Sequence, residues 1–233
     1  MSERILMIET STDCCSVALA EGNRILAERI CEESRQHAAI LAPYISEVLQ
    51  ETGLKAGDLN AIAVSKGPGS YTGLRVGVST AKGLCFGSGK PLIGVDTLQI
   101  LALQGSSSSL SGQAGHPDRI VPMIDARRME VYAAVFDGEG RRLSDTEAVI
   151  LDGESYRADL EAGTVLFIGT GAGKFQTVCH HPNAAFLSCS PLASFMLQPA
   201  LSALQKKEFE DTAYFEPFYL KEFVAGISKK AVL

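Results

Sequence analysis

A run of glycine and other small residues between positions 67 and 87 constrains this chain more than any other feature of its sequence. The run reads G-P-G-S-Y-T-G-L-R-V-G-V-S-T-A-K-G-L-C-F-G and follows the apolar segment Leu59–Ser65. Small residues recur at every fourth position in two series, Gly73-Gly77-Ala81 and Ser79-Gly83-Gly87. Each interior glycine costs a helix roughly 1 kcal/mol relative to alanine, so a helix over 72–87 needs close packing that offsets this cost. The pattern predicts a helix packed tightly against its own domain or against another subunit.

The same run could instead bind an anion. A phosphate-binding P-loop reads G-x-x-x-x-G-K-[ST], whereas Gly73 is followed by Leu74 and Arg75. A strand that leads through a glycine turn to the N-terminus of a helix can still hold a phosphate group, because backbone N–H groups point at the ligand there. Arg75 would then help, and this alternative stays open.

Strand-like and helix-like segments alternate along the chain, which is typical of α/β layering. The expected strands are 4–10, 16–20, 25–30, 59–65 and 92–95, then 120–125, 130–136, 147–151 and 164–168. The first helix ends at Gly53, with Pro43 either in its first turn after a start near Ala39 or at a kink. Asp96 or Thr97 would cap a helix over 98–104. Further helices are expected at 72–87, 155–161 and 190–204, the last interrupted by Pro199.

A glycine- and serine-rich segment divides the chain into two halves with the same outline. The composition changes at G-S-S-S-S-L-S-G-Q-A-G-H-P, which is typical of a flexible linker. We therefore expect a first domain over 1–105, a linker over 106–117 and a second domain over 118–233. Each half begins with strands and continues with alternating helices and strands. Two such lobes around a cleft suggest an actin-like or sugar-kinase-like fold.

Two loops are candidates for holding a phosphate group in that cleft. The first loop comprises Glu9, Thr10, Ser11 and Thr12. Its hydroxyls and backbone N–H groups would bind the phosphate oxygens, and the Glu9 carboxylate would order a water molecule bound to a metal ion. An ordinary hydroxyl-rich hairpin is the alternative. The second is I-G-T-G-A-G-K-F, with glycines at Gly169, Gly171 and Gly173. It departs from the Walker motif at both ends, so it predicts at most a degenerate nucleotide loop.

Charge and composition point away from nucleic-acid binding and from metal chemistry. The net charge is −6 and the isoelectric point about 5.3, whereas phosphate neutralisation needs a basic surface. The six cysteines and four histidines show no metal-ligand spacing, and no nucleophile motif occurs. The first residues do not have the pattern of a signal peptide and no apolar run reaches membrane-spanning length, so we expect neither a leader nor a membrane span. We expect a cytoplasmic protein with reduced thiols and without a catalytic residue, metal or cofactor.

Five segments distributed over nearly the whole chain form recognisable motifs. The most specific is S-K-G-P-G-S-Y-T-G-L-R-V-G-V-S-T-A-K-G-L at 65–84. The other four are I-E-T-S-T-D-C-C-S-V-A-L at 8–19, S-R-Q-H-A-A-I-L-A-P-Y-I at 34–45, I-D-A-R-R-M-E-V-Y-A-A at 124–134 and F-E-P-F-Y-L-K at 215–221. Together they resemble the bacterial TsaB family, formerly YeaZ, of tRNA threonylcarbamoyladenosine biosynthesis proteins.

The resemblance implies two actin-like lobes of the class that includes sugar kinases, Hsc70 and actin. It implies a non-catalytic paralogue of the threonylcarbamoyltransferase TsaD that binds TsaD, is joined by the ATPase TsaE, meets tRNA only through the complex and forms homodimers when alone. In the family the dimer contact uses helices of the N-terminal lobe. The interface residues expected here are Leu41, Tyr44, Ile45, Val48, Gly73, Arg75, Val76, Gly77, Thr80 and Ala81.

Departures from the family pattern leave two other functions to be considered. Glu9 stands where the family usually has aspartate, and Ala38-Ala39 where it has serine-glutamate, which puts a nucleotide site in doubt. One rival is an ATPase or kinase that uses residues 9–12 and 169–173. The other is a metallopeptidase, because relatives have been labelled glycoproteases. The histidine pair with which TsaD-like enzymes hold a metal is missing from the sequence.

Overall fold

The first lobe is built on a five-stranded mixed sheet with the strand order β3-β2-β1-β4-β5. The computed structural model describes residues 2–33, 36–107 and 116–220. The strands are β1 (Arg4–Glu9), β2 (Cys15–Glu21), β3 (Arg24–Cys31), β4 (Ala61–Gly67) and β5 (Leu92–Asp96). β1 pairs antiparallel with β2 and parallel with β4. Both of its faces are buried, which explains its near-continuous apolar sequence.

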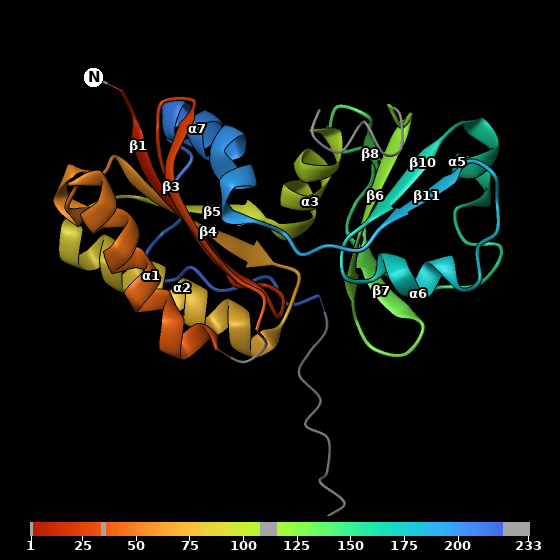
Figure 1. Cartoon of the computed structure of the whole chain (residues 1–233), viewed down its shortest axis with the longest axis horizontal. Coiled ribbons are helices and arrows are strands. Elements are labelled where there is room, and N and C mark those ends of the chain that lie inside the picture. Colours follow the sequence, from red (N-terminus) through yellow and green to blue (C-terminus); the bar gives the residue numbers. More distant parts are fainter. Residues whose placement is uncertain (1, 34–35, 108–115, 221–233) are drawn as a thin grey trace, which may run out of the picture.

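The second lobe repeats this topology. Its sheet has the order β11-β10-β6-β7-β9, with β6 in the place of β1. β6 pairs parallel with β10 and antiparallel with β7, as β1 does with β4 and β2. The strands are β6 (Arg119–Asp125), β7 (Glu130–Ala133), β8 (Phe136–Asp137, paired with β6), β9 (Glu147–Ile150), β10 (Val165–Ile168) and β11 (Ala184–Leu187). The predicted fold class, two α/β lobes that are each a mixed sheet with helices, is confirmed (Figure 1).

Helices cover both faces of each sheet. On one face of the first sheet lie α1 (His37–Thr52) and α2 (Tyr71–Ser88), which share a core with β1, β2 and β4. The other face packs against η2 (Ala193–Met196) and α7 (Leu197–Lys206). On the second sheet, α5 (Arg157–Ala162) and α6 (Ala172–Gln176) cover one face and α3 (Thr97–Ser106) the other. The short η1 (Ala56–Asp58) precedes β4.

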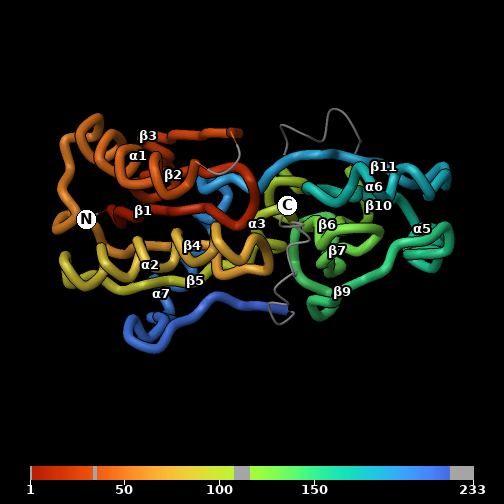
Figure 2. The backbone as a smooth tube through the Cα atoms, turned by 90° about the horizontal axis from the view of Figure 1, so that it is seen from below, coloured from red at the N-terminus to blue at the C-terminus, as the bar shows by residue number. Residues whose placement is uncertain are grey.

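Within the described residues, two connections join the lobes. α3 leaves the first sheet at β5 and packs on β6 and β10 of the second, so it lies between the two sheets in Figure 1. Residues 193–206 return from the second half of the chain to the first sheet, where α7 contacts β1 and β5 (Figure 2). The proposed division into domains at 105–117 remains a prediction, and most of that segment lies outside the described residues.

Several element boundaries differ from the prediction. α1 begins at His37, so Pro43 lies inside the helix and not in its first turn. The expected helix over 190–204 is divided into η2 and α7, with Pro199 in the first turn of α7. α6 and β11 were not predicted from the sequence. Two local signals are confirmed: Gly53 ends α1 with a φ of 68°, and Oδ1 of Asp96 accepts hydrogen bonds from the backbone N–H groups of Leu98 and Gln99 at 2.8 and 3.1 Å.

Candidate functional site

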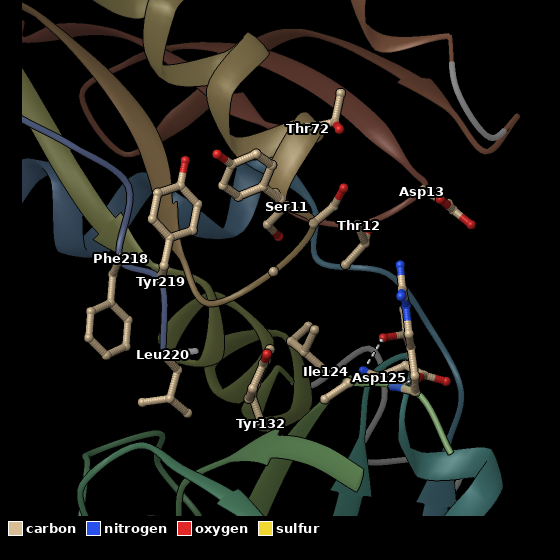
Figure 3. Close-up of a pocket in the computed structure, with 16 residues that line it drawn as sticks. Ser11, Thr12, Asp13, Thr72, Ile124, Asp125, Tyr132, Phe218, Tyr219 and Leu220 are labelled. Carbon is tan, nitrogen blue, oxygen red and sulfur yellow. Dashed lines mark hydrogen bonds between the residues drawn. The ribbon is translucent and has the colours of Figure 1, made fainter. Parts of the chain in front are cut away.

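A cavity of about 870 Å³ lies between the lobes, where loops at the carboxyl ends of corresponding strands meet. The β1–β2 loop and the turn before α2 line it from the first lobe. The β6–β7 loop and Thr170, which follows β10, line it from the second lobe (Figure 3). In open α/β sheets, ligands bind outside the carboxyl ends of the strands, so the repeated topology itself places this cavity.

The two predicted phosphate loops face this cavity only in part. Ser11 and Thr12 line it from one side, and Thr170 lines it from the other. Thr10, the first residue of the β1–β2 loop, is fully buried and is not part of the lining. The glycines of the second loop serve packing: a Cβ at Gly169 would lie 2.5 Å from the Met123 carbonyl oxygen, and one at Gly171 would lie 2.6 Å from a methyl carbon of Val131. At Gly173 a Cβ would meet the Ser188 hydroxyl at 3.1 Å.

Glu9 is a buried acid under the cavity and does not line it. Its side chain is 0% exposed, and Oε1 accepts a hydrogen bond from the backbone N–H of Ser11 at 2.5 Å. Among the described residues, Oε2 has no hydrogen-bond partner. Burial raises the pKa of Glu9 to about 7, although hydrogen bonds from Ser11 act in the opposite direction. The loop therefore rests on a carboxyl group that is largely protonated near pH 6.

The first glycine series brings α2 into contact with the β1–β2 loop. Cβ atoms at Gly73 and Gly77 would collide with the carbonyl oxygen and the hydroxyl of Thr10, and one at Gly69 would collide with the carbonyl oxygen of Ser11. Ser70 caps α2, because its Oγ accepts from the N–H of Gly73 at 3.2 Å, and its own N–H donates to the carbonyl of Ser11 at 2.6 Å. The turn is thus bound to its own lobe.

The second series lies on the opposite, exposed side of α2. Cβ atoms at Gly83 and Gly87 would meet nothing within 4 Å. Between them Phe86 is 91% exposed. α1 lies beside α2 and presents small exposed residues on the same side of the lobe. We call this surface the outer helical face; it comprises Ala38, Ala39, Ala42 and Ser46 of α1 and Ser79, Gly83, Phe86 and Gly87 of α2.

Most of the predicted interface residues lie beneath this face. Six of them are buried within the chain itself: Leu41, Ile45, Val48, Gly73, Gly77 and Ala81. Tyr44, Val76 and Thr80 are partly buried, and Arg75 is exposed. An amphipathic helix turns its apolar face to the core of its own domain and its polar face to solvent. Residues chosen by apolar periodicity are therefore those that face the core. That the two helices carry an interface remains a prediction.

The C-terminal segment 210–220 runs beside α2 to the mouth of the cavity. The N–H of Phe218 donates to the carbonyl of Lys66 at 2.6 Å, and Nζ of Lys82 donates to the carbonyls of Ala213 and Phe215 at 3.2 and 3.1 Å. Nε of Arg75 donates to the Tyr219 hydroxyl at 3.2 Å, and its guanidinium lies 4.0 Å from the centre of the Tyr71 ring. Arg75 is therefore engaged with two aromatic side chains.

The β6–β7 loop forms the opposite rim and was not singled out as a site. Arg127 and Arg128 have φ values of 73° and 50°, a conformation that non-glycine residues rarely adopt outside turns and functional sites. Lys174 holds this loop: its Nζ pairs with Asp125 at 2.8 Å and donates to the carbonyls of Arg128 and Glu130 at 2.7 and 3.1 Å. In the sequence alone, D-A-R-R-M-E stands out only as a family motif, because Lys174, which holds the loop, lies 46 residues beyond Arg128.

Within residues 2–33, 36–107 and 116–220, no group of three or more His, Cys, Asp and Glu side chains is arranged to hold a metal ion. In the same ranges, no helix combines the length and the apolar character needed to cross a membrane.

Comparisons with known proteins agree with this architecture. The family described as "TsaD: tRNA N6-adenosine threonylcarbamoyltransferase" matches residues 24–229. The tRNA threonylcarbamoyladenosine biosynthesis protein TsaB of Escherichia coli is 32% identical over 95% of this chain and 96% of its own length. A Pseudomonas aeruginosa structure, described as an uncharacterized protein with similarity to peptidase YeaZ, has a TM-score of 0.81 and 30% identity over 94% of this chain and all of its own. The tRNA N6-adenosine threonylcarbamoyltransferase of Solidesulfovibrio magneticus is 32% identical over 61% of this chain but only 44% of its own length. The chain belongs to the TsaB (YeaZ) family of tRNA threonylcarbamoyladenosine biosynthesis proteins.

Proposed function

We propose that this chain acts in tRNA threonylcarbamoyladenosine formation by binding, as the non-catalytic partner of a TsaD-type threonylcarbamoyltransferase. The outer helical face carries the proposal. Phe86 is 91% exposed there and is flanked by glycines that have free space above them. A large apolar side chain surrounded by small residues is the arrangement that a partner helix can cover closely, because the small residues admit it and the aromatic ring anchors it.

Charge supports a division of labour within such a complex. With a net charge of −6, this chain is poorly suited to grip the phosphate backbone of tRNA, so the transferase would supply the RNA contacts. A TsaE-type ATPase would join the two proteins in the cytoplasm. When the transferase is absent, a second copy of this chain would cover the same outer helical face and give a homodimer. The transferase and the second copy then compete for one surface.

The proposal is tested with the purified chain and the TsaD-type transferase of the same organism. We expect light scattering to show a homodimer alone and a one-to-one complex with the transferase. Phe86→Asp should weaken both associations roughly tenfold or more, as expected for a buried aromatic anchor. Tyr214→Asp is the matched control, because Tyr214 is 83% exposed but lies on the C-terminal segment. Equal binding by both variants, or modified tRNA formed by this chain alone, contradicts the proposal.

Nucleotide binding in the cavity is a second candidate function. The observation that favours it is that Ser11, Thr12 and Thr170, from the two predicted loops, line one cavity of about 870 Å³. Calorimetric titration with Mg-ATP separates the two functions. Micromolar binding with hydrolysis that is lost in Thr12→Ala, but kept in Thr52→Ala on α1, would establish an enzyme. No heat of binding would leave the outer helical face as the functional surface.

A further inference from the structure

Two cysteines face each other across the hairpin of β2 and β3. In this antiparallel pair Cys15, the first residue of β2, is the direct partner of Cys31, the last residue of β3. Directly opposed residues of an antiparallel pair have Cα atoms about 4.5–5.5 Å apart and side chains on the same face of the sheet. A disulfide needs a Cα separation of about 4.4–6.8 Å. The register therefore places the two Cα atoms within the range of separations that a disulfide requires.

We propose that Cys15 and Cys31 form a reversible disulfide on exposure to a hydroperoxide, which makes this pair an oxidative modification site. The two thiols differ in their exposure to solvent. Cys31 is partly exposed, whereas Cys15 is 0% exposed within the core that α1 and α2 share with the sheet. The oxidant therefore reaches Cys31 first, and Cys15 is the resolving thiol. Burial raises the pKa of Cys15 to about 12, which keeps that thiol protonated and inert toward direct oxidation.

The chemistry balances with hydrogen peroxide as the oxidant. The Cys31 thiolate attacks one peroxide oxygen; the O–O bond breaks, an S–O bond forms, and the departing hydroxide takes up a proton to become water. The Cys15 sulfur then attacks the sulfenic sulfur of Cys31, its proton leaves with the hydroxyl group as a second water, and the S–S bond forms. Two sulfur atoms lose two electrons in total, and the two peroxide oxygens gain them. A dithiol reductant reverses the bond by exchange.

The neighbouring cysteine, Cys14, is less suited to be the partner. It precedes β2, and successive side chains along an extended chain point to opposite faces of the sheet. Cys15 instead has its sulfur on the α1 side, as Cys31 does. There α1 packs against β3, and burial first and the neighbouring Cys31 second raise the pKa of Tyr44 of α1. The disulfide would draw the Cys31 sulfur toward Cys15 and alter this contact between β3 and α1, so oxidation would also be sensed at α1.

The test exposes the full-length, reduced, folded chain to graded hydrogen peroxide, blocks remaining thiols and maps tryptic peptides without reduction. We expect a linked pair of peptides, residues 5–24 with residues 30–35, which dithiothreitol releases. Because the first peptide carries both Cys14 and Cys15, variants assign the partner. The link should be lost in Cys15→Ser and in Cys31→Ser, and kept at wild-type yield in Cys14→Ser. Cys85→Ser is the matched control, because Cys85 is a buried thiol on α2.

Circular dichroism establishes that each variant is folded. Detection of the linked peptides in the wild-type chain tests the disulfide even if a variant fails to fold. Hydrogen exchange over residues 37–52 should rise in the oxidised wild type and not in oxidised Cys31→Ser. The inference is overturned if Cys31 proceeds to sulfinic acid without a link, if the link forms only in denaturant, or if it persists in Cys15→Ser. None of these outcomes depends on whether the outer helical face binds a transferase.

Discussion

Gly77 in α2 lies directly against the side chain of Thr10 in the β1–β2 loop, and a Cβ on Gly77 would collide with the Thr10 hydroxyl. Both residues are buried. The contact joins the start of α2 to the loop that borders the interlobe cavity. It gives the first glycine series an internal structural role, distinct from that of the second series on the outer helical face.

Alanine substitutions should separate the two glycine series. We expect Gly77→Ala to lower the free energy of unfolding by about 1–3 kcal/mol, because the added methyl group overpacks the contact with Thr10. Gly83→Ala should instead raise it by up to about 1 kcal/mol, since alanine favours the helix and nothing lies within 4 Å. Urea unfolding, at protein concentrations too low for the chain to associate, measures both free energies. Destabilisation by Gly83→Ala would show that this side of α2 is covered within the monomer.

The buried acid Glu9 should make stability depend on pH. Burial raises the pKa of Glu9 from the ordinary value of 4.5, which holds in the unfolded chain, to about 7 in the folded chain. Between these values the folded state holds a proton that the unfolded state has lost, so the free energy of unfolding falls as pH rises from about 4.5 to 7 and then levels off. The full effect is on the order of 3 kcal/mol.

Glu9→Gln should remove this part of the pH dependence, because the amide keeps a hydrogen-bond acceptor for the N–H of Ser11 and does not ionise. Urea unfolding at several pH values from 5 to about 8 makes the comparison. Glu161→Gln, at an exposed position of α5, is the matched charge change. The same slope in wild type and Glu9→Gln would show that Glu9 is ionised throughout this range.

Lys174 should be important for the order of the β6–β7 loop. Lys174→Met keeps most of the aliphatic length but removes the ion pair with Asp125 and the hydrogen bonds to Arg128 and Glu130. Its side chain is only 15% exposed, so we expect a loss of about 1–3 kcal/mol in the free energy of unfolding and faster hydrogen exchange over 125–130. Lys206→Met, at an exposed position of α7, should change neither. Unchanged exchange in Lys174→Met would show that the loop holds its own conformation.

The C-terminal segment should loosen when its contact with α2 is removed. Lys82→Met deletes the hydrogen bonds from Nζ to the carbonyls of Ala213 and Phe215. We expect faster hydrogen exchange over 213–219, with little change over β4. Lys90→Met, which follows α2, is the control. If exchange over 213–219 stayed slow, the Phe218–Lys66 backbone hydrogen bond and the contacts of Tyr219 would be sufficient to hold the segment.

The order and type of most elements were predictable because their signals are local. Apolar alternation and period, the αL position of Gly53 and the cap at Asp96 depend on residues close in sequence. For Pro43 the start of α1 at His37 excludes the first-turn alternative, because packing of Leu41 and Ile45 into the core stabilises a helix through the proline, against its local preference. β11 was missed because its four residues carry little periodicity and are strand-like only beside β10.

The sequence by itself determined the fold class, the family and the presence of a tightly packed glycine helix, because motif identity and periodicity are properties of the linear chain. Only the tertiary structure decided which glycines are covered. Gly77 meets Thr10 and Gly83 meets nothing, although both stand in series of small residues spaced by four. It also placed Glu9 beneath the cavity and brought Cys31 opposite Cys15. The physical reason is that burial and pairing arise between segments far apart in sequence, and no local pattern specifies which face of an element its distant partner will cover.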